Sequence, residues 1–334
     1  MYIEIIVYSL FSFLLLFLFT KISYKLNLVD IPDNRKIHSR ETAYTGGISI
    51  SLIFLFTLQY LDIFDRNLGL ILSISFLISL VGLIDDKYHL NTGGKLSLQI
   101  IPVFYLIIFE GFVLNHIGDY NYFKLELGTF AVPFTLLSVL FLTNAFNYFD
   151  GLDGTLGFTT ISVLGILLFL VRNESTSLNL FLLTLSVPII IFLCFNFSIF
   201  KLPKLFLGDS GSLMLGFIIS FVLIYLANQR LIHPILLAWS VVIFVYEFLS
   251  VNLIRLKNNQ NPFKAGQDHL HHLLFKKTKS IFITNLFIFL INIILFIIGY
   301  FSFLIINPIF SLILFMSFFI IFLFLRNKYS NSKH

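Results

Sequence analysis

The stretch LLSVLFLTNAFNYFDGLDG, residues 136–154, joins a run of apolar side chains to a group of amides and carboxylates. Asn144, Asn147, Asp150 and Asp153 follow one another at intervals of three, so neighbouring members share one face while a helix continues. The two glycines loosen the helix, which lets the last carboxylates bend into a site. The stretch predicts a membrane helix that ends in a polar site; the alternative is a helix end that carries polar residues at random.

The whole chain has the composition of a protein that uses lipid as its solvent. Of its 334 residues 58% are hydrophobic and 12% are charged, and the mean hydropathy is +0.94. We therefore expect a single all-α, polytopic membrane domain spanning residues 1–334. The apolar segments predict eleven transmembrane helices, at about 3–20, 46–61, 68–84, 96–113, 131–146, 156–171, 179–198, 211–227, 234–255, 282–302 and 308–325.

The basic residues predict the orientation of these helices. Eighteen of the 22 Lys and Arg residues lie in one set of alternate loops, and such loops stay cytoplasmic. The N-terminus is therefore expected outside and the C-terminus in the cytoplasm. The formal charge of +5 reflects this topology and an inner-leaflet surface, not binding to nucleic acid. The single cysteine, Cys194, excludes an internal disulfide and a thiolate metal cluster.

Four polar groups fall on the predicted cytoplasmic face. They are Asp85–Asp86 in GLIDDKYHL, the NxxNxxDGLDG stretch, Asp209 in LFLGDSGS, and the histidines of QDHLHHLL. Carboxylates at a membrane boundary are costly unless they bind a cation, face a polar cavity or pair with one another. Oxygen ligands without a thiolate favour Mg²⁺, with Mn²⁺ as an alternative, and Mg²⁺ commonly completes its shell with substrate phosphates. The acids therefore indicate a phosphorylated substrate handled at this face.

Glycine-rich helix starts lie beside these acids. In GDSGS, Gly208 lets the backbone approach a ligand, and the helix that begins near Ser210 offers free N–H groups to an anion. Asp209 is either a ligand of the cation or a simple N-cap. In GGKLSLQ, Lys95 is either a phosphate contact or a positive-inside anchor. Lys36, in the basic stretch RKIHSRETAYTGG, binds either the substrate or anionic lipid.

The histidine motif has two readings. His269, His271 and His272 could bind Zn²⁺, but no cysteine lies nearby and the acids suit Mg²⁺ better. We favour hydrogen bonds from these histidines to a diphosphate, because their charge is tunable near neutral pH.

Taken together, DD, NxxNxxDGLDG, GDSGS and HxHH, in this order and on one face, resemble the polyprenyl-phosphate N-acetylhexosamine-1-phosphate transferases. The likeness runs from about Asn34 to His272. It implies transfer of an N-acetylhexosamine 1-phosphate from a UDP-sugar to undecaprenyl phosphate, with release of UMP and a requirement for Mg²⁺. It also implies a multi-pass protein of the bacterial inner membrane that starts a cell-envelope polysaccharide. The sequence leaves open whether the chain acts alone or as a homodimer.

The resemblance implies a role for each matching residue. The family's aspartate pair matches Asp85–Asp86, whose first member is a candidate base on the lipid phosphate. Its metal ligands match Asp209 and, through NxxN, Asn147. The nucleotide-sugar site receives Asp150 and Asp153, Asn144 is a substrate contact, a phosphate contact falls on Lys95, and the donor diphosphate or sugar meets the histidines. Direct displacement is favoured over a covalent aspartyl intermediate, because the lipid phosphate is already mostly ionised.

The histidine loop separates the branches of this family. DHLHHLL differs from the PIHHHFE-like run of muramyl-pentapeptide transferases, the alternative branch, and RKIHSRETAYTGGISI is similar to enzymes that begin antigen and teichoic-acid synthesis. UDP-GlcNAc is the favoured donor, with UDP-GalNAc or a rarer N-acetylated deoxysugar as alternatives.

Two classes of protein outside this family also place acids on membrane helices. An intramembrane aspartyl protease needs glycine where Phe206 stands. A cation transporter predicts carboxylates near the midplane and repeated halves, whereas these acids gather at one face and no repeat is visible.

Overall fold

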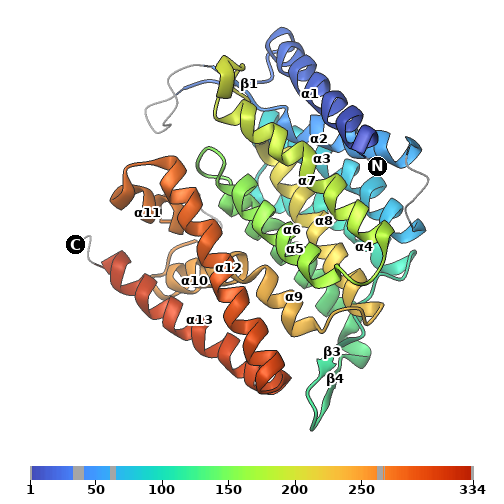
Figure 1. Cartoon of the computed structure of the whole chain (residues 1–334). Coiled ribbons are helices and arrows are strands. Elements are labelled where there is room, and N and C mark those ends of the chain that lie inside the picture. Colours follow the sequence, from blue (N-terminus) through green and yellow to red (C-terminus); the bar gives the residue numbers. More distant parts are fainter. Residues whose placement is uncertain (1, 33–40, 61–64, 262–265, 267, 332–334) are drawn as a thin grey trace.

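The computed structural model describes residues 2–32, 41–60, 65–261, 266 and 268–331. Helices make up most of it (Figure 1). The α-helices are α1 (Tyr2–Lys25), α2 (Gly46–Tyr60), α3 (Arg66–Tyr88), α4 (Thr92–Ile108), α5 (Ala131–Phe149), α6 (Thr155–Val171), α7 (Thr176–Asn196), α8 (Gly208–Asn228), α9 (Pro234–Ser240), α10 (Val242–Lys257), α11 (Leu270–Thr278), α12 (Ile281–Ile305) and α13 (Pro308–Asn331). The other described elements are the 3₁₀ turns η1 (Gly128–Phe130) and η2 (Ile199–Lys201), and two antiparallel hairpins, β1 (Val29–Asp30) with β2 (Thr42–Ala43) and β3 (His116–Asp119) with β4 (Lys124–Glu126).

The helices are those of an all-α, polytopic membrane protein, as the composition predicts. Within the described residues, seven of them are long and apolar enough to cross a membrane, and α9 with α10 makes an eighth if the bent pair is one span. Three shorter apolar helices cover 46–58, 92–108 and 155–171. Each of the eleven expected segments thus contains helix, in the expected order. A helix satisfies its own backbone groups, which lipid cannot do.

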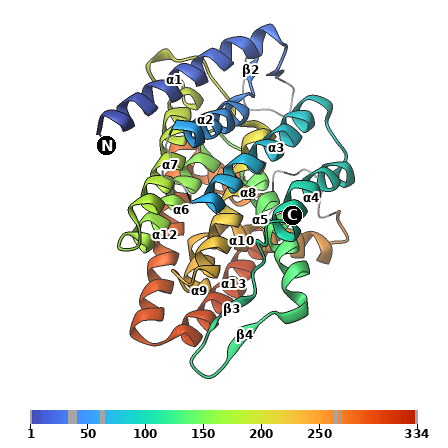
Figure 2. The same cartoon turned by 90° about the vertical axis from the view of Figure 1, so that its right-hand side faces the viewer.

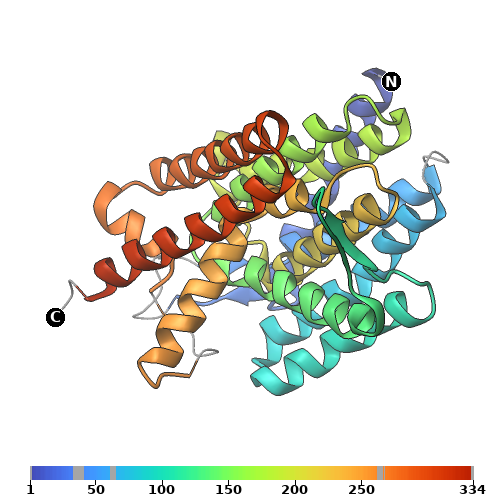
Figure 3. The same cartoon turned by 90° about the horizontal axis from the view of Figure 1, so that it is seen from below.

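The segment expected as one helix over 234–255 is broken. Its two parts, α9 and α10, are bent by 74°. Gly299 of α12 lies so close to Trp239 that an added Cβ would stand 2.3 Å from the indole ring, and the Trp239 Nε1–H donates to Ser311 Oγ of α13 at 3.0 Å. The two C-terminal helices therefore pack closely against the bent pair; they lie side by side along one edge in Figure 3.

Helix α8 forms the centre of the molecule, because 89% of its most apolar stretch is buried inside the protein. Its first turn is held between α2 and α3 by close backbone approach. An added Cβ at Gly82 would lie 2.3 Å from the Ser210 nitrogen, and one at Gly47 would lie 2.0 Å from the Gly211 nitrogen. These contacts require small residues, and they fix the GDSGS segment relative to the ends of two other helices.

The two hairpins mark opposite ends of the molecule. β3 and β4 lie at the lower end in Figures 1 and 2, whereas β1 in Figure 1 and β2 in Figure 2 lie toward the upper end. The Ala43 carbonyl of β2 accepts the Phe206 N–H at 2.7 Å, so the upper hairpin is joined to the segment that leads into α8.

Candidate active site

A cavity of about 1040 Å³ opens where α3, the α5–α6 loop and the start of α8 meet. Segments far apart in the sequence line it, including β1, the end of α3, the loop 150–154 and the segment 204–209. The lining includes seven of the predicted site residues, namely Asp85, Asp86, Asp150, Asp153, Gly208, Asp209 and His272. Three of the four polar groups of the sequence, with one histidine of the fourth, therefore surround one space.

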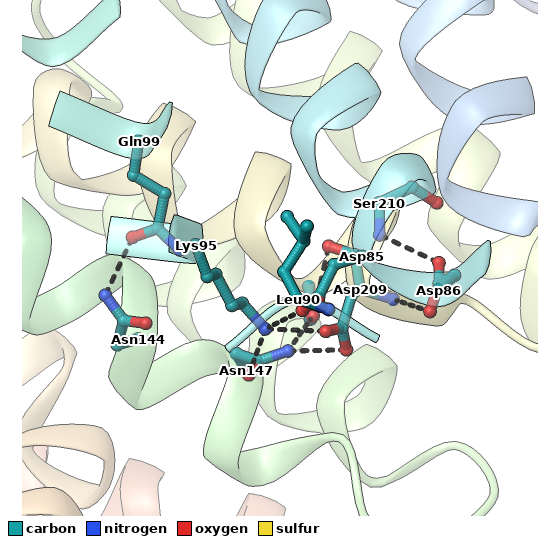
Figure 4. Close-up of polar contacts among 10 residues, drawn as sticks. Asp85, Asp86, Leu90, Lys95, Gln99, Asn144, Asn147, Asp209 and Ser210 are labelled. Carbon is teal, nitrogen blue, oxygen red and sulfur yellow. Dashed lines mark hydrogen bonds and ion pairs between the residues drawn. The ribbon is translucent and has the colours of Figure 1, made fainter. Parts of the chain in front are cut away.

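Lys95 of α4 lies among the oxygens of three other helices (Figure 4). Its Nζ is 2.5 Å from Asp209 Oδ2, 2.8 Å from Asp85 Oδ2 and 3.1 Å from Asn147 Oδ1. Asn147 also donates from Nδ2 to Asp209 Oδ1 and to Ser212 Oγ, both at 2.8 Å. The fold therefore brings together four side chains that the sequence places in separate motifs.

Asp86 faces away from Lys95 and holds the start of α8 (Figure 4). The backbone N–H groups of Asp209 and Ser210 donate to its carboxylate, at 3.0 and 3.3 Å. The expected free N–H groups at this helix start are therefore engaged by the chain's own carboxylate. Gly208 makes the arrangement possible: its φ is +72°, and a Cβ there would lie 2.6 Å from Asp86 Oδ2.

The loop 150–154 carries two further carboxylates, and each has a different environment. Burial, with repulsion from the Asp209 and Asp153 carboxylates, raises the pKa of Asp150 to about 8. Asp153 pairs with Lys204 Nζ at 2.6 Å. The Asp153 carbonyl accepts a hydrogen bond at 2.7 Å from Asn285 of α12, which also accepts one from Thr155 Oγ1 at 2.7 Å.

Lys204 and Asn285 were not predicted as parts of the site. Lys204 stands four residues before Gly208, within the segment that leads into GDSGS, and it lines the cavity. Asn285 is one of two fully buried asparagines in the mainly apolar helix α12, and polar residues inside such a helix are the signal that would have indicated it.

Asn144 lies outside the carboxylate group, contrary to its expected place in the substrate site. Its Nδ2 donates to Gln99 Oε1 at 2.9 Å and to the Leu140 carbonyl at 2.8 Å, so it joins α5 to α4 (Figure 4). A helix needs 3.6 residues for a full turn, so each three-residue step falls short of a turn. Over the two steps from Asn144 to Asp150 this difference adds up, and the Asn144 side chain points to another side of the helix.

The three histidines are not equivalent. His272 lines the cavity. His271 is fully buried behind the α5–α6 loop, where an added Cβ at Gly151 would lie 2.2 Å from its Nε2, and neither ring nitrogen has a hydrogen-bond partner in the described part of the chain. His269 packs edge-on against Tyr148. Burial lowers the pKa of His269 to about 4 and that of His271 well below its ordinary value.

The motif of these histidines forms the helix α11, which the sequence did not predict. Two of the three side chains support the loop and the neighbouring helix from behind, and only His272 reaches the cavity wall. Lys36, the remaining predicted substrate contact, lies outside the described residues.

The oxygens around Lys95 suit a hard divalent cation. Asp209 Oδ2, Asp85 Oδ2 and Asn147 Oδ1 already converge on one positive group, and all three are oxygen donors. Within the described residues, no three Asp, Glu, His or Cys side chains are grouped so as to hold a metal ion alone. Asp85 and Asp209 supply carboxylates and Asn147 an amide oxygen, which is a donor set that Mg²⁺ can take when water and phosphate complete its shell.

Sequence comparisons relate the chain to known enzymes. Residues 68–227 match the family model described as glycosyl transferase family 4. The undecaprenyl-phosphate alpha-N-acetylglucosaminyl 1-phosphate transferase of Escherichia coli (strain K12) is 28% identical over 80% of this chain and 75% of its own length. The enzyme of the same name from Yersinia pestis is 30% identical over 82% of this chain and 76% of its own. The probable undecaprenyl-phosphate N-acetylglucosaminyl 1-phosphate transferase of Bacillus subtilis (strain 168) is 31% identical, over 76% and 71%. With these relatives and this site, the chain belongs to glycosyl transferase family 4.

Proposed function

We propose that the protein transfers N-acetylglucosamine 1-phosphate from UDP-GlcNAc to undecaprenyl phosphate. The products are a lipid-linked sugar diphosphate and UMP. The names of the relatives support this reaction. The observation that carries it is the convergence of Asp85, Asn147 and Asp209 on Lys95, at the edge of a cavity where membrane helices end.

The reaction brings several negative charges together. An oxygen of the lipid phosphate attacks the β-phosphorus of the donor, a new P–O bond forms, and the bond between the β-phosphorus and the bridging oxygen breaks, so that UMP leaves with that oxygen. Lys95 stabilises the developing charge, because its ammonium lies at the centre of the site. Asp85, 2.8 Å from Lys95, is placed to accept a residual proton from the lipid phosphate.

Asp209 and Asn147 are the proposed ligands of Mg²⁺, with Mn²⁺ as the alternative. When bound, the cation supplies charge neutralisation at the phosphates. Asp86 fixes the start of α8 by accepting hydrogen bonds from the backbone N–H groups of Asp209 and Ser210. Asp150 and Asp153 face the cavity with His272, and we assign these three to the donor.

The membrane topology follows the basic residues. We propose eleven spans, with the N-terminus outside and the C-terminus in the cytoplasm of a bacterium, in the inner membrane. The shorter apolar helices and the bent pair complete the count. The cavity then opens toward the cytoplasm, where nucleotide sugars are made, and the helix ends around it lie at the level of a lipid phosphate.

Release of UMP by the purified protein tests this reaction. The protein in detergent receives undecaprenyl phosphate, Mg²⁺ and one donor at a time: UDP-GlcNAc, UDP-GalNAc or UDP-MurNAc-pentapeptide. We expect UMP from UDP-GlcNAc only, dependent on the lipid phosphate, abolished by EDTA and absent in Asp209→Ala. UMP from the pentapeptide donor alone would favour the muramyl branch. No UMP from any donor, with folded protein, would contradict the reaction.

A further inference from the structure

A cluster of charged side chains lies outside the cavity, where α10, the segment before α11 and α13 meet. It comprises Glu247, Arg255, Asp268 and Arg326, and we call it the Glu247 cluster. Glu247 is fully buried, and Arg255 and Arg326 are 4% and 6% exposed. Charged side chains inside membrane helices are costly and mark functional positions. Two acids and two bases balance here, so the cluster as a whole carries no net charge.

The Glu247 cluster holds one short segment, Asp268–Leu270. Arg255 binds the Asp268 carboxylate through Nε at 3.0 Å and Nη2 at 2.7 Å. The Leu270 N–H donates to Glu247 Oε1 at 3.0 Å. Arg326 contacts both the Glu247 carboxylate and the Asp268 carbonyl oxygen.

This segment is the entry to α11, the helix that carries the histidines. Because α11 starts at Leu270, fixing that residue's N–H fixes the first turn, in which His271 and His272 stand. His271 supports Gly151 from behind, and His272 lines the cavity. Helix α13 is thus connected to the cavity wall. Its Arg326 contacts the Glu247 carboxylate and the Asp268 carbonyl, and these two groups hold the start of α11. Figure 1 shows α13, α10 and α11 on the same side of the molecule.

We propose that Arg326 is a positioning residue for the donor site. It holds Glu247 and the Asp268 carbonyl so that the first turn of α11 places His272 at the cavity and His271 behind the loop 150–154. The effect on the reaction rests on the proposed function. The anchoring itself does not, and it can be measured separately.

A simpler role for Arg326 would be to neutralise the charge of Glu247. The double variant Arg326→Met/Glu247→Gln separates the two roles. It keeps the charges balanced, since Arg255 and Asp268 still pair, and the amide oxygen that replaces the Glu247 carboxylate can still accept the Leu270 N–H. It removes the contacts of Arg326 with the Asp268 carbonyl and with the side chain at position 247, and it places an amide in place of the carboxylate beside His269.

The test combines steady-state kinetics with hydrogen exchange. UMP release is measured with UDP-GlcNAc and undecaprenyl phosphate varied separately, for the wild type, Arg326→Met, Arg326→Lys, the double variant and Lys328→Met. The last removes an exposed charge two residues further along the same helix. We expect Arg326→Met and the double variant to lose at least about tenfold in kcat/KM for UDP-GlcNAc, with an unchanged KM for undecaprenyl phosphate. Arg326→Lys should recover part of this loss, and Lys328→Met should match the wild type.

The backbone amides of residues 270–274 should exchange faster in Arg326→Met and in the double variant. Wild-type kinetics in the double variant would show that Arg326 serves only to neutralise the charge of Glu247, and this would overturn the proposal. An equal loss for both substrates, or unchanged exchange at 270–274, would also overturn it. Absence of UMP from the wild type would instead refute the proposed function, and the exchange measurement would still decide whether Arg326 anchors α11.

Discussion

Lys95 is the residue on which the electrostatics of the site depend. It is the cation shared by Asp85 and Asp209, whose carboxylates would otherwise repel each other across a small, partly buried space. In the proposed reaction, the same position, between oxygens of three helices, is where the phosphate charge is neutralised. Lys95 therefore contributes both to holding the helices together and to the proposed chemistry.

Replacing this lysine should expose both contributions. In Lys95→Met, kcat for UMP release should fall about 100-fold, as for the loss of a single stabilising group in an active site. Thermal stability in detergent should fall too, and added Mg²⁺ should raise the Tm of the variant more than that of the wild type, because a cation can take the place among the same oxygens. Lys257→Met, at an exposed position, is the control. An equal Mg²⁺ effect on both proteins would contradict this role.

Gly208 is the residue whose backbone allows the site to form. At φ +72° any other residue is strained by about 1–2 kcal/mol, and here a Cβ would also collide with Asp86 Oδ2 and the Tyr44 carbonyl. Gly111 has the same φ of +72° but nothing within 4 Å of an added Cβ.

Comparison of Gly208→Ala with Gly111→Ala separates the effect of backbone strain from the effect of the collision between the new Cβ and Asp86. Both variants should lose about 1–2 kcal/mol of unfolding free energy through strain. Only Gly208→Ala should lose most of its UMP-releasing activity, because Asp86 must move away from the start of α8. Measurement of Tm and activity for the two variants checks this, and retained activity in Gly208→Ala would show that the Asp86 contact is dispensable.

At the scale of elements, α12 acts as a support for the loop 150–154. Its two buried asparagines make comparable hydrogen bonds: Asn285 binds the Asp153 carbonyl, and Asn292 binds Ser162 Oγ and the Ser240 carbonyl. Of these two amides, Asn285 alone reaches the cavity loop. The pair therefore offers a test in which stability and function are separable.

Asn285→Leu and Asn292→Leu should both lower the free energy of unfolding by roughly 1–3 kcal/mol, because each leaves buried polar groups unpaired. Asn285→Leu should in addition lower kcat for UMP release, since Asp153 loses its backbone anchor. Activity per folded molecule, alongside Tm, is the measurement. A similar fall in activity in both variants would indicate a general effect of the helix and not a support of the loop.

The entry to α11 should make stability depend on pH. His269 has a pKa of about 4 in the folded protein, below the ordinary 6.5, because burial disfavours its charged form. Glu247, 3.4 Å from its Nδ1, is already engaged by Arg326. Below pH 6.5 the unfolded chain therefore binds a proton that the folded chain does not.

Stability should accordingly fall as the pH drops from about 6.5 toward 4, by on the order of 2 kcal/mol at pH 5 from this group. His269→Asn removes the titration, so its Tm should fall less than that of the wild type between pH 7.5 and pH 5 in detergent. Equal falls would mean that His269 is protonated in the folded state.

The sequence singled out the acids that line the cavity but not their long-range partners. Asp85, Asp150 and Asp209 were found because acids at the ends of apolar segments are rare and costly. Lys204 and Asn285, the partners of Asp153, were not found, since only the packing of α12 and the α7–α8 connection brings them near it. The position of Asn144 was missed because adjacent helix faces cannot be told apart by spacing alone.

For the whole molecule, the sequence predicted the class and order of the helices but not their geometry. Apolar runs identify helices because lipid leaves the backbone no other partner. The bend between Ser240 and Val242 lies beside Trp239, which packs against Gly299 about sixty residues away, and no local pattern reveals that contact. The helix α11 depends in the same way on contacts with α10 and α12.

The proposed topology can be checked at the two ends of the molecule. In a Cys194→Ser background, a cysteine in place of Tyr122, 85% exposed in the β3–β4 hairpin, should react with a membrane-impermeant maleimide added to intact spheroplasts. A cysteine in place of Lys279 should react only after permeabilisation. The reverse pattern would place the cavity outside and contradict the cytoplasmic site.

The most direct test of the transfer of a sugar phosphate is the fate of the donor's β-phosphate. UDP-GlcNAc labelled with ³²P at this position is incubated with the purified protein, undecaprenyl phosphate and Mg²⁺, and the label is followed in the lipid and nucleotide fractions. Cleavage between the two phosphates predicts label in the lipid product and unlabelled UMP. Label that stays in the nucleotide as UDP, with only the sugar transferred, would contradict the proposed reaction.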